Sequence, residues 1–223
     1  MARLKVDAAL VIATAPVVGC ALLAALAVAQ RNVFDALVRE DSVLEWGEVC
    51  AYGLAAVMSI RVALRTGGYV RLGYGLLAVA AVAAIGEELS WGQRLVHVTT
   101  PEAVAAANRQ EELNLHNLAS VESATRFLLL AAATYGAMLP LLLRPGPFVP
   151  PRALVPAFAV VAGYFIVRLA VFSEPTYAQA KFSEWPEFCF AAAVALTAHS
   201  TLSRLASASD EVPKENPAYA GLS

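Results

Sequence analysis

The feature that most constrains this chain is a run of 22 residues, 8–29, without a single charged side chain. A helix of that length can cross the roughly 30 Å hydrocarbon core of a bilayer. Five further uncharged apolar runs follow, at 49–60, 72–86, 127–143, 153–167 and 188–203. Each of these reaches spanning length once a charged residue at one or both ends is included. Because a backbone in lipid must satisfy its own hydrogen bonds, we expect all six to be helices.

The composition also indicates a membrane protein. Apolar residues make up 59 % of the chain and charged residues only 15 %, whereas soluble domains carry about 25 % charged residues. A net charge of -2 excludes a nucleic-acid binder that relies on bulk electrostatics, and three cysteines cannot form a disulfide scaffold. The lipid bilayer is therefore the expected partner.

The sequence predicts an all-α, polytopic transmembrane helical bundle in residues 1–205. Its six expected spans lie at about 8–29, 46–64, 72–94, 126–143, 153–172 and 186–203. The polar tail, 206–223, is expected to be disordered and cytoplasmic. Between spans three and four, Thr100-Pro101-Glu102 is typical of a helix start, so we expect an interfacial helix over about 101–118.

The distribution of Lys and Arg predicts the orientation. With the N-terminus inside, nine of the 16 basic residues fall in short cytoplasmic segments, and both termini are cytoplasmic. Arg greatly outnumbers Lys in an Ala- and Val-rich chain, which favours a multi-pass protein of a bacterial inner membrane. A cleavable signal peptide is the alternative for the first span, but the run is longer than a signal core of about 7–15 residues.

Four predicted helices carry an ionisable residue at the same depth. Counted from a basic residue at the inner end, the separations are 16 or 17 residues, for the pairs Arg65 and Glu48, Arg71 and Glu88, Arg152 and Arg168, and Arg204 and Glu187. At 1.5 Å per residue, each separation is ~24–26 Å. We therefore expect these outer groups to meet in a shared pocket near the outer edge of the hydrocarbon.

A simpler interpretation is that helix ends meet water at this depth. The helix dipole favours carboxylates in the first turns of helices. This effect alone would explain the positions of Glu45, Glu48, Glu184 and Glu187. Ser42 and Glu45 also fit a capping box. Against this interpretation, Glu88 lies at a C-terminal helix end, where the dipole disfavours an acid. Arg168 lies within a span and should need a carboxylate partner.

Two segments that open outward-starting helices resemble each other. Residues 45–50 read Glu-Trp-Gly-Glu-Val-Cys and residues 184–189 read Glu-Trp-Pro-Glu-Phe-Cys, so four of six positions are identical. Cys50 and Cys189 would then lie at similar depth. We expect buried free thiols there, with a disulfide as the alternative.

The loop after the third span adds a candidate metal ligand. Asn108, Glu112 and His116 fall at i, i+4 and i+8, on one face of the expected 101–118 helix. A carboxylate and an imidazole one turn apart form half of many metal sites, although a solvated helix face is the ordinary alternative. The candidate ligands of a divalent metal are Glu48, Glu88, Glu112, His116 and Glu187.

Residues 86–94, Gly-Glu-Glu-Leu-Ser-Trp-Gly-Gln-Arg, are followed by Asn108, Glu112 and Asn-Leu-His-Asn at 114–117. This pattern resembles a signature of bacterial multi-pass membrane proteins whose activity is uncharacterised. The resemblance covers about 32 residues and implies no activity. Intramembrane CAAX-type proteases and alkaline ceramidase-like hydrolases are less similar. The former have an Arg closer to the paired glutamates than Arg94 is, and the latter bind zinc with three His in their spans.

The leading functional hypothesis is a membrane-embedded enzyme whose site lies at the extracytoplasmic lipid boundary. Its candidate catalytic residues are Glu48, Glu88, Glu187, Arg94 and Arg168. The carboxylates would bind a divalent metal or perform acid–base work, and the arginines would hold an anionic head group or orient a carboxylate. A site at head-group depth predicts a lipid or lipid-linked substrate. The alternatives are a proton- or cation-coupled small transporter and a non-enzymatic membrane assembly protein.

Overall fold

The computed structural model describes residues 7–96, 98–108, 112–115, 118–172 and 174–210. Within these ranges the fold is all-α without a strand, and six helices are long and apolar enough to cross a membrane. The predicted fold class is confirmed. The long helices are α1 (Ala8–Ala29), α3 (Val43–Arg65), α4 (Gly68–Glu88), α7 (Ala119–Leu142), α8 (Val155–Ala170) and α10 (Glu184–Asp210). The short ones are α2 (Arg31–Val38), η1 (Ser90–Gly92), α5 (Gln93–Val96), α6 (Glu102–Ala105), η2 (Arg152–Leu154) and α9 (Tyr177–Lys181).

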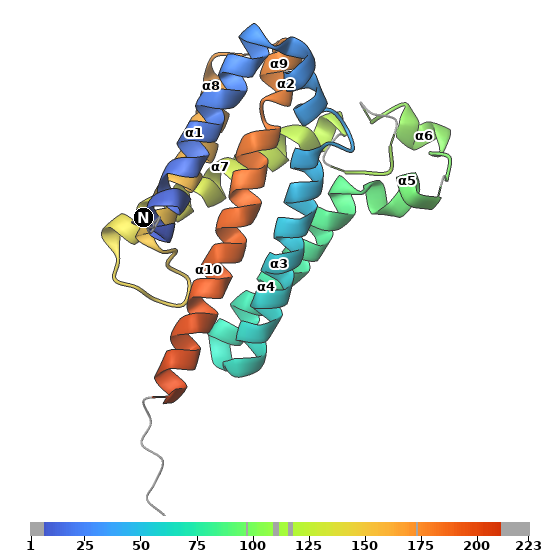
Figure 1. Ribbon diagram of the computed structural model, residues 1–223. Helices are drawn as coiled ribbons and strands as arrows, with labels where there is room; N and C mark the ends of the chain where they lie inside the picture. Colours follow the sequence, from blue (N-terminus) through green and yellow to red (C-terminus); the bar gives the residue numbers. More distant parts are fainter. Residues whose placement is uncertain (1–6, 97, 109–111, 116–117, 173, 211–223) are drawn as a thin grey trace, which may run out of the picture.

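The long helices pack in an arc. Helix α4 packs on α3, α3 on α10, α10 on α8, and α8 on α7, while α1 lies against α8 and α10 (Figure 1). Helices α4 and α7 are consecutive spans, yet they lie at the two ends of this arc. Extensive packing between them is absent from the described residues. The segment 89–118 connects them at the outer end of the bundle.

Helices α3 and α10 form the centre of the bundle and run in the same direction (Figure 1). Small side chains spaced by four residues line their contact, with Ala51 and Ala55 on α3 and Ala191 and Ala195 on α10 all buried in one cluster. Small residues at this spacing let two helix backbones approach closely in a membrane. The start of α3 is therefore held beside the start of α10.

The third span ends earlier than the sequence predicts. Helix α4 stops at Glu88, because Ser90, Trp91 and Gly92 all adopt the left-handed backbone region, with φ of 46°, 52° and 82°. A right-handed helix cannot continue through three such residues. The expected end near residue 94 is therefore wrong, and Glu88 is the last residue of its helix.

The interfacial helix predicted over 101–118 is also much shorter, because α6 ends at Ala105. The Asn108 side chain donates to the backbone oxygen of Asn114 at 2.7 Å and to its Oδ1 at 2.8 Å. Asn108 also forms an isolated antiparallel bridge with Leu118. Asn side chains compete with helical hydrogen bonding in this way, so the segment folds back on itself.

The last helix is longer than expected. Helix α10 continues to Asp210, so the predicted tail of 206–223 begins inside it. Residues 211–223 lie outside the described part of the chain. At the same inner end, the Tyr74 hydroxyl donates to the Pro147 carbonyl and lies 2.9 Å from Thr201 Oγ1. These contacts hold the connection between α7 and α8 against α4 and α10.

Candidate functional site

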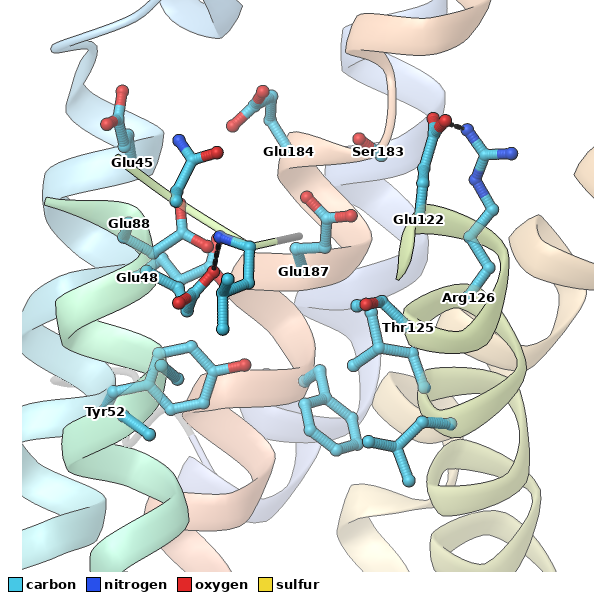
Figure 2. Close-up of a pocket in the computed structure, with 18 of the residues that line it drawn as sticks. Glu45, Glu48, Tyr52, Glu88, Glu122, Thr125, Arg126, Ser183, Glu184 and Glu187 are labelled. Atoms are coloured by element: carbon cyan, nitrogen blue, oxygen red, sulfur yellow. Dashed lines mark hydrogen bonds and ion pairs between the residues drawn. The ribbon is translucent and has the colours of Figure 1, made fainter. Parts of the chain in front are cut away.

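A cavity of about 850 Å³ lies between the two ends of the arc, bounded by α3, α4, α7, α8 and α10 (Figure 2). We call it the glutamate cavity. The carboxylates that line it are Glu40, Glu45, Glu48, Glu87, Glu88, Glu112, Glu122, Glu184 and Glu187. Arg168 lines it as well. The structure therefore brings Glu48, Glu88, Arg168 and Glu187 to one cavity, which the helix spacing predicts.

Glu48 is the most enclosed carboxylate of the cavity, with 2 % of its surface exposed. Its Oε2 is buried and has no hydrogen-bond partner among the described residues. A buried polar atom without a partner costs free energy, so such an atom in a folded protein calls for a functional explanation. Tyr52 lies one turn further in on α3 and directs its hydroxyl into the cavity (Figure 2).

Glu187 occupies the place in α10 that Glu48 occupies in α3. The two residues are equivalent in the similar segments 45–50 and 184–189, and their helices are parallel neighbours. Gly47 keeps the helix starts close, since a Cβ there would be 3.1 Å from the ring of Phe188. The Glu187 carboxylate points into the cavity across from Glu48 and Glu88 (Figure 2). Glu48 is near enough to both for their charges to interact.

Three basic side chains line the cavity, and each has a partner. Two form ion pairs with nearby glutamates, Arg126 with Glu122 and Lys181 with Glu184, the latter at 3.0 Å. Arg168 is 7 % exposed, and its Nη1 donates to the carbonyl of Phe172 at the end of its own helix. Among the described lining residues, carboxylates thus outnumber bases nine to three.

Glu87 shapes the loop that lines the outer end of the cavity. Its Oε1 accepts a hydrogen bond from Trp91 Nε1 at 2.8 Å, and its Oε2 accepts one from the backbone N–H of Leu115 at 2.6 Å. Gly86 leaves room for the indole, because a Cβ there would be 2.9 Å from the ring of Trp91. The adjacent glutamates therefore differ in role: Glu87 fastens the loop and Glu88 faces the cavity.

Glu112 takes part in the same loop. It accepts hydrogen bonds from the hydroxyl of Ser90, which is fully buried, and from Asn114 Nδ2 at 3.3 Å. Because α6 ends before Asn108, Asn108 and Glu112 do not share the predicted helix face. His116 lies outside the described residues, and so does the side chain of Arg94.

The four described candidate metal ligands, Glu48, Glu88, Glu112 and Glu187, come from three helices and the loop. Within the described ranges, no three His, Cys, Asp or Glu side chains form a group that could hold a metal ion. The divalent metal therefore stays a prediction. Cys50 is exposed, Cys189 is buried, and both are free thiols.

Sequence reasoning missed Tyr52 and Lys181. Tyr52 could have been found, because a residue four positions after Glu48 lies on the same helix face. Lys181 ends α9, a short helix whose capping box, Thr176 with Gln179, was readable in the sequence. This helix brings the ammonium of Lys181 to Glu184 at the start of α10.

Comparisons with known proteins identify no relative. No family model matches the chain, and neither a curated protein nor a solved structure is similar to it. Arguments about function therefore depend on the geometry and chemistry of the glutamate cavity.

Proposed function

We propose that this chain is an integral membrane enzyme that uses the glutamate cavity for acid–base catalysis on a lipid or lipid-linked substrate. The observation that carries the proposal is the buried Oε2 of Glu48, which has no partner in the described structure. A desolvated carboxyl group with one oxygen left unpartnered can exchange a proton with a bound substrate.

The two central carboxyls have different surroundings, which suits a division of roles. Glu48 is buried beside Tyr52, whereas Glu187 is half-buried and follows Ser183 by one helical turn. Two carboxyls in unlike environments can act as general acid and general base in one reaction. We assign the base to Glu48 and the acid to Glu187, with the Tyr52 hydroxyl orienting the substrate between them (Figure 2).

The shape of the cavity supports a lipid-like substrate. Beyond the carboxylates, its walls are apolar and include Leu77 and Ala81 of α4, Leu129 of α7, and Phe190 and Val194 of α10. A substrate chain can lie against these walls while its polar group reaches Glu48. In the orientation that the positive-inside rule favours, which we propose for a bacterial cell membrane, the glutamates face the extracytoplasmic side and both termini are cytoplasmic.

A metal site, a transporter and a purely structural role have less support. A metal site would need grouped ligands, which the described residues do not provide. A cation-coupled transporter needs polar groups along a path, but the described lining residues inward of Tyr52 are apolar. In a purely structural glutamate cluster, we would expect every buried carboxylate oxygen to be hydrogen-bonded, and Glu48 Oε2 is not.

The experiment is a search for turnover. The full chain is reconstituted in nanodiscs and incubated with a bacterial lipid extract, and mass spectrometry follows the lipids over time. We expect one lipid to be converted by the wild type and by Glu102→Gln, an exposed glutamate of α6 outside the cavity. Glu48→Gln should slow conversion by about 100-fold or more, the usual contribution of a general base. If the wild type converts no lipid, the proposal that this chain is an enzyme is refuted.

A further inference from the structure

We infer that the glutamate cavity binds a primary ammonium group attached to an apolar chain, so that its ligand is a single-chain aminolipid. The inference rests on the proposed function for the place of the site and names the substrate class that the site accepts. It follows from the charge of the central carboxyls, from the unpartnered buried oxygen of Glu48, and from the apolar walls.

The charge of the cavity favours a cation. The two central carboxyls, Glu48 and Glu187, are close enough for their charges to interact, and the three basic side chains that line the cavity are engaged by Glu122, Glu184 and the Phe172 carbonyl. Carboxylates that share a low-dielectric site repel one another, so a bound cation stabilises them. An anionic head group would place another negative charge beside Glu48 and Glu187, which counts against the head-group role expected for Arg168.

The hydrogen-bonding capacity of Glu48 selects the kind of cation. Its Oε2 needs a donor that the described protein does not supply. A primary ammonium has three N–H donors, enough for Glu48 and for acceptors on Glu187 and Tyr52, whose polar atoms point into the same space (Figure 2). A quaternary ammonium has no N–H and would leave Glu48 Oε2 without a donor. The site should therefore prefer a primary amine.

The remaining cavity accommodates the chain. Its volume of about 850 Å³ lies within the range of roughly 300–1,000 Å³ that small-molecule sites occupy. Ala132 of α7 faces the same space as Leu77 of α4, and these two helices do not pack extensively in the described structure. An alkyl chain between them would bury apolar surface that the protein itself leaves uncovered.

The experiment measures binding of radiolabelled dodecylamine to the full chain in zwitterionic nanodiscs, with empty nanodiscs subtracted. We expect saturable binding of one amine per chain. Unlabelled dodecyltrimethylammonium should compete at least about tenfold more weakly, because it lacks the N–H donors. Propylamine should compete at least about 100-fold more weakly, because it lacks the chain. Dodecanoate should not compete. Equal competition by the trimethyl compound or by dodecanoate would overturn the inference.

The variants test the site itself. Glu48→Gln should weaken dodecylamine binding by about tenfold or more, the effect of losing one charge-assisted hydrogen bond. Glu102→Gln removes the same charge outside the cavity and should leave binding unchanged. Ala132→Phe fills the apolar end without altering a carboxylate and should also weaken binding. Thermal unfolding checks that each variant is folded. If Glu48→Gln does not fold, the binding affinity of Ala132→Phe is the test of the inference. Unchanged affinity in a folded Glu48→Gln or Ala132→Phe refutes the inference.

These outcomes separate the inference from the proposed function. Specific amine binding without turnover of any lipid would support the ligand class and contradict the enzyme. Turnover that depends on Glu48, without binding of dodecylamine, would support the enzyme and contradict the ligand class.

Discussion

Gly19 of α1 lies directly against the indole of Trp185 at the start of α10, where a Cβ at position 19 would be 2.0 Å from the ring. The indole Nε1 donates to the carbonyl of Pro16 at 2.9 Å, one turn earlier in α1. The first and last spans are thus joined two residues from Glu187. Helix α1 contributes no described side chain to the glutamate cavity, yet it supports the helix that carries Glu187.

Gly19→Ala should destabilise the protein by about 1–3 kcal/mol, because the new methyl group overlaps the indole and forces α1 away from α10. Thermal unfolding in detergent measures the effect as a lower midpoint. Gly53→Ala is the matched control, since a Cβ at position 53 of α3 meets nothing within 4 Å. That control should be neutral or stabilising by up to ~1 kcal/mol. Equal midpoints for the two variants would contradict the described contact.

Glu87→Ala should loosen the loop over the cavity, because the substitution removes the acceptor of both Trp91 Nε1 and the Leu115 N–H. Hydrogen bonds to a carboxylate contribute about 1.5–3 kcal/mol each, so exchange of the Leu115 amide should speed up by about tenfold or more. Hydrogen–deuterium exchange measures this directly. Glu102→Ala, in the same segment, should leave Leu115 unaffected, and unchanged exchange in Glu87→Ala would rule out the anchoring role.

Tyr74→Phe should cost about 1 kcal/mol of stability, since the buried hydroxyl loses its hydrogen bond to Pro147. Tyr74 is 1 % exposed, whereas Tyr69, on the same helix, is 73 % exposed. Tyr69→Phe therefore serves as the control and should have no measurable effect. Thermal unfolding of the two variants side by side provides the test, and equal losses would show that the Tyr74 hydroxyl does not matter.

The proposed orientation can be tested with single cysteines in a cysteine-free background. Glu102→Cys, in α6, should react with a membrane-impermeant maleimide added to intact cells. Pro145→Cys, in the exposed connection between α7 and α8, should react only after the membrane is opened. The reverse labelling pattern would place the glutamate cavity on the cytoplasmic side.

The sequence was sufficient to predict six long apolar helices and the approach of Glu48, Glu88 and Glu187 to one cavity. Both follow from one-dimensional rules, since apolar length defines a span and the rise per residue defines a depth. Glu48 and Glu187 meet for that reason: they begin parallel helices at equal distances from Arg65 and Arg204. The rules could not show that Glu48 has a buried oxygen without a partner, because that depends on how neighbouring side chains orient.

The loop was poorly predicted because its contacts are not local. The N–H of Leu113 donates to the side chain of Gln93, 20 residues earlier, at 2.6 Å. Leu115 likewise donates to Glu87, 28 residues earlier. Helix signals such as Pro101 act over one turn only. They therefore indicate where a helix starts, but not where hydrogen bonds to residues distant in sequence end it.

The capping box expected at the start of α3 forms only in part. Ser42 accepts a hydrogen bond from the N–H of Glu45 at 3.4 Å, as the pattern predicts. The carboxylate of Glu45 then accepts from the N–H of Asp41 at 2.6 Å, one residue beyond the expected partner. Asp41 has a φ of 57°, a left-handed conformation that composition rules do not anticipate.

The parallel pairing of α3 with α10 has a consequence for biosynthesis. The ribosome completes α3 and α4 more than 100 residues before it completes α10. In co-translational insertion into a bilayer, Glu48 and Glu88 would therefore arrive before the helix that carries Glu187. The nascent chain would then need protonation or an insertion factor to shield the two acids from lipid until its final segment arrives.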